Sequence, residues 1–381
     1  MSAPAAPETP RILLVISAEP APETLEEIAA GRQPRRDYLA LRDASGADLL
    51  TPSMATATAV GRMRARLGGK PAALAWAAFQ RRNRYKTIFT DNEGTGLPLA
   101  LLLRGAHPGK PRHVCLSHYL SSAKKRVLFR LGAGRRIDTL ITHATAQARI
   151  AVETLGLLAK QVALLPYFAD ERFWDPALAT PAPSQERPMI CSAGLEFRDY
   201  ATLIAALRDQ EVDARIGAAS HWARHNAFGA SAQLPANVTV SAYNYQQLRD
   251  LYASARFVVI PLRDVDNQAG ITTILEAMAM GKAVVVTRTR GQTDVVRDWR
   301  SGAAAPPPGF LAAPEMAQSL GALPTGWYVR PDDSDDLRDA INYLLAHPEI
   351  AEEMGRNARR VVKGYFGLDA FVARFATLLR D

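Results

Sequence analysis

Short runs of Val, Ile and Leu recur along the chain and alternate with longer segments whose apolar residues are three or four positions apart. The short runs are typical of strands buried on both faces of a parallel sheet, and the longer segments are typical of helices that cover such a sheet. The predicted strands cover residues 11–17, 47–51, 86–91, 112–118, 139–143, 189–193, 212–217, 237–242, 257–261, 283–287 and 327–330. This alternation predicts an α/β fold with doubly wound parallel sheets.

The clearest unit of strand, helix and strand spans residues 257–287. After the first strand comes the polar loop 264–271, where Thr272 or Thr273 can cap the helix that follows. The helix is expected to end at Gly281, before the second strand. Its apolar face is predicted from residues at helical spacing, which are Ile274, Leu275, Met278 and Ala279.

A loop at the carboxyl end of a strand is where doubly wound sheets bind ligands. The free amides at the start of the following helix would attract a phosphate group. Glu276 lies about one turn into this helix, where its carboxylate can accept hydrogen bonds from sugar or ribose hydroxyls. The segment therefore predicts a site for a phosphorylated sugar or nucleotide.

The segment Leu275–Val285, LEAMAMGKAVV, resembles the signature of the retaining nucleotide-sugar glycosyltransferases of the GT-B fold, in particular family 4 (glycosyl transferases group 1). In that signature an acidic residue is followed, after seven residues, by a Glu that opens E-A-M-A-x-G-x-P-V-V. Glu276 matches the second acidic residue, whereas Gln268 stands where the first is expected. A Gln side chain can still bond a hydroxyl but carries no charge. The resemblance implies two Rossmann-like domains that face each other across a cleft.

The resemblance also implies roles for residues of the second domain. Glu276 would hold the ribose hydroxyls of the donor, and Arg198, on the register of a family lysine, would bind its diphosphate together with the turn at Gly194. Tyr243 precedes a helix at the place where relatives seat the nucleobase. The loop that would address the transferred sugar and the diphosphate consists of Asn267, Gln268, Ala269, Gly270, Ile271 and Thr272.

Two residues of the first domain are candidates for the catalytic, acceptor side. His118 ends the predicted strand 112–118, and in the family a strand at this point ends in a His that faces the donor sugar. Glu93 follows the strand 86–91 at the start of a helix predicted over 97–104. A carboxylate at this position either serves the acceptor or caps the helix, and the sequence favours neither alternative.

The predicted organisation is a disordered tail at 1–10, a first domain at 11–174, a linker at 175–188 and a second domain at 189–363. The linker is rich in Pro and Ala and poor in large apolar residues. By resemblance, the last helix, within 364–381, crosses back to the first domain. An insertion at 301–324, rich in Pro, Gly and Ala, has no assigned role.

Composition fits a soluble globular protein, with 48% hydrophobic and 22% charged residues in 381. No apolar run approaches the roughly 20 residues of a membrane span. The residues at the amino terminus lack the basic start and apolar core of a signal peptide. Cys115 and Cys191 are expected to be buried free thiols, which together with the missing signal peptide predicts a cytoplasmic protein.

The net charge of +8 is unevenly distributed. Residues 1–175 hold 25 Lys or Arg against 15 Asp or Glu, whereas residues 176–381 hold 21 against 23. A basic first half predicts an anionic partner, such as an acidic membrane surface or an anionic acceptor. The basic amphipathic segment 122–136 either lies on such a membrane or is an ordinary surface helix. The chain has no nucleic-acid-binding motif, so nucleic acid is the least favoured of the anionic partners.

The function expected from these residues is the transfer of a hexose from a nucleotide diphosphate sugar, UDP- or GDP-linked, to a hydroxyl acceptor. No cofactor or metal is expected, because the chain has no cluster of His and Cys residues. A non-catalytic sugar- or partner-binding protein is the alternative, motivated by Gln268. A dinucleotide-dependent oxidoreductase is set aside, since no G-x-G-x-x-G follows a predicted strand.

Overall fold

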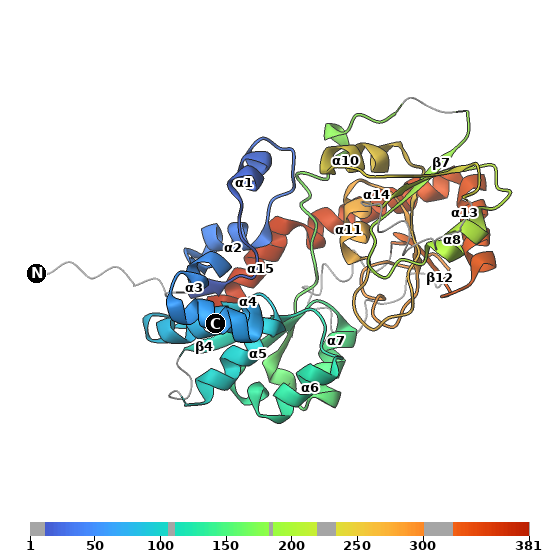
Figure 1. Cartoon of the computed structure of the whole chain (residues 1–381). Coiled ribbons are helices and arrows are strands. Elements are labelled where there is room, and N and C mark those ends of the chain that lie inside the picture. The colour runs from blue at the N-terminus through green and yellow to red at the C-terminus, as the bar shows by residue number, and fades with distance from the viewer. Residues whose placement is uncertain (1–11, 106–110, 183–185, 219–233, 301–322, 381) are drawn as a thin grey trace, which may run out of the picture. The chain divides into compact units, whose positions relative to one another are not determined.

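The computed structural model of the chain (Figure 1) describes residues 12–105, 111–182, 186–218, 234–300 and 323–380. The chain divides into two compact units. The first unit comprises residues 1–22, 36–165 and 372–381, and the second comprises residues 23–35 and 166–371. The predicted tail at 1–10 and most of the predicted insertion at 301–324 lie outside the described residues.

The described residues of the first unit form a sheet of six parallel strands in the order β2-β1-β3-β4-β5-β6. The strands are β1 (Ile12–Val15), β2 (Asp48–Leu50), β3 (Thr87–Thr90), β4 (Arg112–Ser117), β5 (Thr139–Thr142) and β6 (Val162–Leu164). The connecting helices are α2 (Asp37–Ser45), α3 (Pro52–Thr56), α4 (Ala59–Arg81), α5 (Glu93–Leu102), α6 (Ala123–Arg130) and α7 (Thr145–Arg149). The predicted strands are therefore present, each shortened by a residue or more.

The sequence pattern is helical from Pro71 to Arg82, and helix α4 is longer than this pattern predicts. Its second half matches the periodicity that begins at Pro71, but helical structure starts at Ala59, where the side chain of Thr58 caps it by accepting a hydrogen bond from the Gly61 amide at 3.0 Å. A break at Gly69 (φ 75°, ψ 178°) separates the two halves. The first half was missed because its large apolar residues do not face the core.

The second unit holds another sheet of six parallel strands in its described residues, in the order β12-β11-β10-β7-β8-β9. The strands are β7 (Met189–Ala193), β8 (Asp213–Gly217), β9 (Val238–Ser241), β10 (Val258–Ile260), β11 (Val284–Thr287) and β12 (Gly326–Val329). The helices are α1 (Pro22–Ala29), α8 (Tyr200–Leu207), α10 (Tyr245–Ser254), α11 (Ile271–Ala279), α13 (Ser334–Ala346), α14 (Pro348–Val361) and α15 (Leu368–Arg380). Pro22 and the part of α15 after Phe371 are assigned to the first unit.

The boundary between the two units lies after residue 165, earlier in the chain than the linker predicted at 175–188. Residues 166–174 belong to the second unit, because Phe173 and Trp174 are buried in its core and pack edge to face at 4.9 Å. Residues 23–35 also belong there, since the guanidinium of Arg35 forms ion pairs with Asp170 at 2.6 Å and with Asp369 at 2.7 Å. Burial of these aromatic residues and the ion pairs of Arg35 thus set the boundary of the second unit, which the Pro- and Ala-rich composition of 175–188 did not predict.

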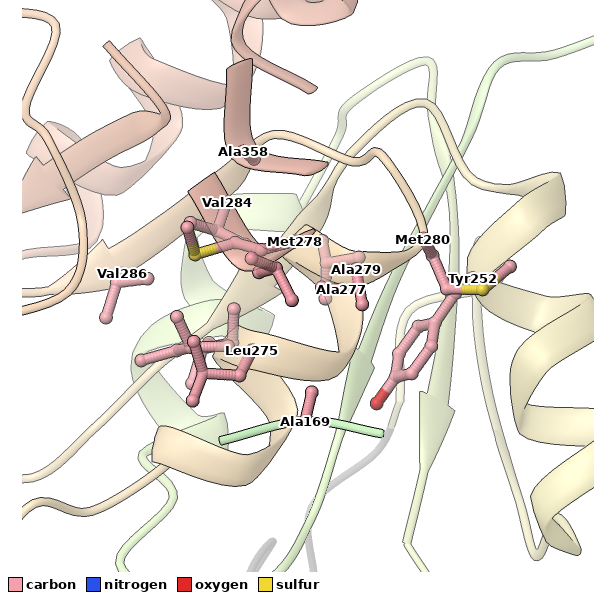
Figure 2. Packing of buried hydrophobic residues seen from close by; sticks show 14 of the residues in the cluster. Ala169, Tyr252, Leu275, Ala277, Met278, Ala279, Met280, Val284, Val286 and Ala358 are labelled. Carbon is pink, nitrogen blue, oxygen red and sulfur yellow. The ribbon is translucent and has the colours of Figure 1, made fainter. Parts of the chain in front are cut away.

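Two clusters of buried residues form the core of the second unit. One joins α8 and α13 to the sheet, and the other joins α10, α11 and α14 to it. Helix α11 presents Leu275, Met278 and Ala279 to the sheet residues Val284 and Val286 (Figure 2). The predicted apolar face of this helix is therefore its buried face. In the part of the chain that the structure describes, no helix has the length and apolarity that crossing a membrane requires.

Candidate functional site

The order of strands in the second unit places a topological switch point between β7 and β10. The chain runs from β7 outward to β8 and β9, and from β10 outward to β11 and β12. The loops that follow β7 and β10 therefore leave the sheet at the same carboxyl edge. These loops, residues 194–199 and 261–270, hold most of the donor residues predicted from the sequence.

The two loops are tied to each other by backbone hydrogen bonds. The amide of Arg263 donates to the Phe197 carbonyl at 2.9 Å, and the amide of Asp199 donates to the Pro261 carbonyl at 3.0 Å. Phe197 adopts a positive φ of 55°, which is uncommon for a residue with a side chain. These bonds fix the residue between them, Arg198, against the sheet.

The Arg198 side chain is held by three hydrogen bonds and is 5% exposed. Its Nε donates to the Ala193 carbonyl at 2.9 Å, Nη1 donates to the Glu196 carbonyl at 3.0 Å, and Nη2 donates to Thr273 Oγ1 at 3.0 Å. No carboxylate of the described residues forms an ion pair with it, and burial lowers its pKa. A buried guanidinium with neutral partners keeps its positive charge available to an anion.

Glycine is required on both sides of this guanidinium. A Cβ on Gly194 would lie 2.3 Å from Arg198 Nη2, and a Cβ on Gly270 would lie 3.0 Å from Ile260 Cγ2, with Arg198 Nη1 next at 3.5 Å. Both glycines have a positive φ, 95° and 75°, which disfavours any side chain. The backbone of both loops can therefore approach the Arg198 guanidinium closely.

Gly270, and neither Thr272 nor Thr273, is the N-cap of α11. The helix begins at Ile271, two residues earlier than a cap at Thr272 would require, because Gly270 turns the chain into it. Thr273 is thereby free to accept the hydrogen bond from Arg198. At the other end, Gly281 and Lys282 donate to the carbonyls of Met278 and Ala277, as the predicted glycine cap requires. The amino end of α11 and the guanidinium together form a positive environment.

Polar atoms near this helix start are buried without hydrogen-bond partners among the described residues. They are the Oδ1 atom of Asn267, both amide atoms of Gln268 and the Oε1 atom of Gln292. Gln292 is fully buried, and its Nε2 donates to the Ala269 carbonyl at 3.1 Å. Buried amides without hydrogen-bond partners destabilise a folded protein, so these side chains are candidates for hydrogen bonds to a ligand. Thr272, by contrast, is exposed.

Glu276 is 7% exposed and contacts a tyrosine that the sequence analysis did not identify. The hydroxyl of Tyr252, on α10, donates to Glu276 Oε2 at 3.2 Å. Burial raises the pKa of Glu276 to about 8, and burial also raises the pKa of Tyr252. The carboxyl is therefore mostly neutral at pH 7 in the free protein, and hydroxyl donors from a ligand would favour its ionised form.

Tyr243 lies in the loop after β9, and its ring packs on Gly217 at the carboxyl end of β8. Asn244 rather than Tyr243 caps α10, through a capping box with Gln247. Tyr243 is half-buried, so one part of its ring remains accessible to a planar group.

The sheet of the first unit has its own switch point, between β1 and β3. Ser17, after β1, donates to Asp91 Oδ2 from both its amide and its hydroxyl at 2.6 Å. The exposed His118, after β4, donates from Nε2 to the Asp91 carbonyl at 3.1 Å. Burial raises the pKa of Asp91 and that of Asp37, and the two carboxylates repel each other. Asp37, Asp91 and His118 thus gather at one edge of this sheet.

Glu93 is buried, and both of its carboxylate oxygens are bound. Oε2 accepts a hydrogen bond from the His118 amide at 3.0 Å, and Oε1 forms an ion pair with Lys125. Burial raises the pKa of Glu93, but the hydrogen bonds from Lys125 and His118 outweigh it and lower that pKa overall. The helix cap is Asn92, whose side chain accepts from the Thr95 amide. Glu93 therefore neither caps α5 nor has a free oxygen, and its contact holds the backbone of His118.

Two further histidines are structural. His143, whose ring centroid lies 5.5 Å from that of His118, is bound through Nδ1 to the Leu165 carbonyl at 2.7 Å. His113 bonds Thr90 and the Arg136 carbonyl, each at 3.2 Å. Burial lowers the pKa of His143 to about 3 and that of His113 to about 4, so both are neutral. Within the described residues no three His, Cys, Asp or Glu side chains are arranged as metal ligands.

The comparisons with known proteins agree with this architecture. Residues 201–324 match the model of a family described as glycosyl transferases group 1. No curated protein matches the chain by sequence. Among solved structures, sucrose-phosphate synthase from Thermosynechococcus elongatus is 17% identical, with a TM-score of 0.66 over 97% of this chain and 98% of that chain.

Two other solved structures are similar in fold along nearly their whole length. A glycosyltransferase from Rickettsia africae is 13% identical, with a TM-score of 0.62 over 98% of each chain. The Anabaena protein HepE, solved in complex with UDP-glucose, is 16% identical, with a TM-score of 0.62 over 97% of this chain and 99% of that chain. The chain therefore has the GT-B fold, and its residues 201–324 match the model of the glycosyl transferases group 1 family.

Proposed function

We propose that the protein transfers a hexosyl group from a nucleotide diphosphate sugar to a hydroxyl acceptor, with retention of configuration and without a resident metal ion. The observation that carries the proposal is the Arg198 guanidinium, buried beside the start of α11 without a carboxylate partner among the described residues. A charge in this position needs an anion to complete its environment. A diphosphate supplies that anion and accepts hydrogen bonds from guanidinium and helix amides alike.

The leaving group defines what these residues do during transfer. The bond between the anomeric carbon and the distal phosphate oxygen breaks, and the electron pair stays on the diphosphate. The acceptor oxygen bonds the carbon on the face that the diphosphate leaves, and its proton passes to the departing phosphate oxygen. Negative charge grows on the diphosphate in the transition state. Arg198 and the first-turn amides of α11 stabilise that charge, because they are oriented before the reaction begins.

The remaining contacts orient the donor and the acceptor. Glu276 binds the ribose hydroxyls, with Tyr252 fixing its carboxyl group. The unpartnered amides of Gln268 and Asn267 bind hydroxyls of the transferred sugar. We assign His118 and Asp91 to binding of the acceptor hydroxyl, because both lie at the carboxyl edge of the first unit's sheet. His118 is exposed and Asp91 is half-buried. Glu93 is a positioning residue for His118.

The donor base and sugar are proposed by analogy with the similar structures. HepE was solved with UDP-glucose, and starch synthase IV from Arabidopsis thaliana with ADP and acarbose. A UDP- or GDP-linked hexose remains the proposed donor, and the half-buried ring of Tyr243 is the proposed contact of the base. The acceptor is proposed as a glycan, a glycolipid or a small molecule.

The test is calorimetric titration of UDP, GDP, ADP and TDP in metal-free buffer into the wild type, Glu276→Gln and Arg198→Met. We expect one nucleotide to bind the wild type and to bind both variants at least tenfold more weakly. The matched control is Glu353→Gln, which alters an exposed carboxylate on α14. Transfer is then measured with the sugars of that nucleotide.

Three results would change the assignment. If no nucleotide binds the wild type at millimolar concentration, the donor site is wrong. If a nucleotide binds and none of its sugars is transferred or hydrolysed, the non-catalytic binding protein, favoured by Gln268 in place of an acidic residue, replaces the enzyme. If both variants bind as the wild type does, the nucleotide lies elsewhere.

A further inference from the structure

The first half of α4, residues 59–68, lies on the surface of the first unit and packs against α3. Ala55 of α3 and Gly61 of α4 are buried where the two helices meet. The break at Gly69 separates this half from the second half of α4, which carries the core residues Leu74 and Ala78. Residues 59–68 are therefore anchored on one side only.

The opposite side of these helices exposes large apolar side chains. Val60, Met63 and Leu67 are 42%, 49% and 80% exposed, and Met54 on α3 is 46% exposed. Positions 60, 63 and 67 follow helical spacing, so the three side chains share one face. An apolar face that points away from the core of its own unit marks an interaction surface.

The segment that carries this face is basic, although a carboxylate, Glu19, lies beside α3 and accepts hydrogen bonds from the amide and hydroxyl of Ser53. Residues 49–90 contain eight Lys or Arg and no Asp or Glu, so this segment alone accounts for an excess equal to the net charge of the whole chain. Arg62, Arg64 and Arg66 alternate with the exposed apolar residues. None of the three forms an ion pair with a carboxylate of the described residues. Their local contacts are with carbonyls and a ring, as in Arg62 with the Ala57 carbonyl and Arg64 with Trp76.

We propose that the exposed face of α3 and of the first half of α4 (Met54, Val60, Met63 and Leu67 with Arg62, Arg64 and Arg66) docks onto an anionic membrane surface. An interfacial helix buries apolar side chains among the acyl chains while its basic residues contact anionic headgroups. A second copy of the same face would bring like charges together. A nucleic acid would satisfy the arginines but would leave Leu67 in water. A lipid surface satisfies both features.

Helix α6, within the segment 122–136, is the other basic helix of this unit and fits the surface less well. Val127 and Leu131 are exposed there, but Lys125 is engaged in the ion pair with Glu93. Helices α3 and α4 follow the carboxyl end of β2, at the sheet edge that also carries Asp91 and His118. Docking through α4 would therefore bring the proposed acceptor groups towards the lipid surface. Membrane docking is a property separate from the proposed sugar transfer, so it can be measured in the absence of a nucleotide sugar.

The experiment is co-sedimentation of the full chain with vesicles of phosphatidylcholine, with and without 30 mol% phosphatidylglycerol. We expect binding only to the anionic vesicles, weakening as salt increases. Each basic residue at such a surface contributes about fivefold in affinity, so Arg62→Gln, Arg64→Gln and Arg66→Gln together reduce it about a hundredfold. Met63→Gln with Leu67→Gln reduces it as well. The matched control, Leu158→Gln with Lys160→Gln, changes an exposed apolar and basic pair elsewhere and leaves binding unchanged.

A second measurement reports on the contact itself. Cys115 and Cys191 are buried, so an environment-sensitive fluorophore on Leu67→Cys labels this position selectively. A blue shift on addition of anionic vesicles supports the proposal. The proposal is overturned if the chain binds no vesicles, if the α4 variants bind as the wild type does, or if the label responds to duplex DNA and not to vesicles. Unchanged melting temperatures of the variants show that they are folded.

Discussion

Replacing Glu276 by Gln should stabilise the protein while weakening nucleotide binding. The carboxyl group is buried, contacts Tyr252 and has a pKa raised to about 8 by burial. An unfolded glutamate titrates near 4.5. Below that value both states are protonated, and the raised pKa costs nothing. As the pH rises from 4.5 to 8, the unfolded chain ionises and the folded one does not, which favours unfolding.

The magnitude follows from the width of that pH window. At about 1.4 kcal/mol per pH unit, a shift from 4.5 to about 8 corresponds to about 5 kcal/mol of lost unfolding free energy above pH 8. Gln has nearly the same shape and can still accept the Tyr252 hydrogen bond, but it does not ionise. With an unfolding entropy of about 2.1 cal/mol/K per residue, the melting temperature of the 381-residue chain shifts by about 1.3 °C per kcal/mol, so Glu276→Gln should melt about 6 °C above the wild type at pH 8.5. The two proteins should melt together at pH 4.5.

The assay is thermal melting of the wild type, Glu276→Gln and the exposed control Glu353→Gln across pH 4.5–8.5. A difference between wild type and Glu276→Gln that is the same at every pH would refute the reasoning, because a buried carboxyl must produce a pH-dependent difference. A control that behaves like Glu276→Gln would refute it as well. A gain in stability with a loss of nucleotide affinity is the expected signature of a residue retained for binding.

Four further predictions concern the candidate sites at the carboxyl edges of the two sheets. Nucleotide affinity of the wild type, measured relative to Glu276→Gln by calorimetry, should rise as the pH rises from 6.5 to 8, because ligand hydroxyls bind the ionised carboxylate. Gly270→Ala should lower the unfolding free energy by about 1–2 kcal/mol in denaturant titrations and weaken nucleotide binding, whereas Gly364→Ala, which meets no neighbour, should do neither. Lys125→Met should destabilise the fold by about 2–4 kcal/mol, by leaving a buried carboxylate unpaired, and adding Glu93→Gln should recover most of that loss in a double-mutant cycle. Sugar-transfer rates should not change after treatment with EDTA, and a rate restored only by added divalent ions would contradict the proposed leaving-group stabilisation.

Patterns local in sequence predicted much of the second unit. The β-branched runs that became β10 and β11 are buried on both faces, and the apolar face of α11 follows helical spacing. Arg198 was predicted from its resemblance in register to a family lysine that precedes the following helix. Each of these features depends on residues close together in the chain, which is why a single sequence reveals them.

Tertiary contacts account for what the sequence did not reveal. Tyr252 lies 24 residues before its partner Glu276, so nothing local links them. Glu93 is bound by Lys125 and by the His118 backbone, and neither contact is visible as a motif. Asp37 and Asp91 meet only because β1 and β3 are neighbours in the sheet. Of these two carboxylates, only Asp91 lies at the end of a predicted strand, so its position in the sequence could have identified it as a candidate.

The most direct test of the donor site compares a nucleoside diphosphate with its nucleoside in the wild type and in Arg198→Met. The nucleotide is the one that binds best in the calorimetric panel. The account predicts that the wild type binds the diphosphate at least a hundredfold more tightly than the nucleoside, and that Arg198→Met loses most of this difference while keeping its nucleoside affinity. Equal discrimination by both proteins would contradict the account, because the diphosphate would then not be bound by the buried guanidinium.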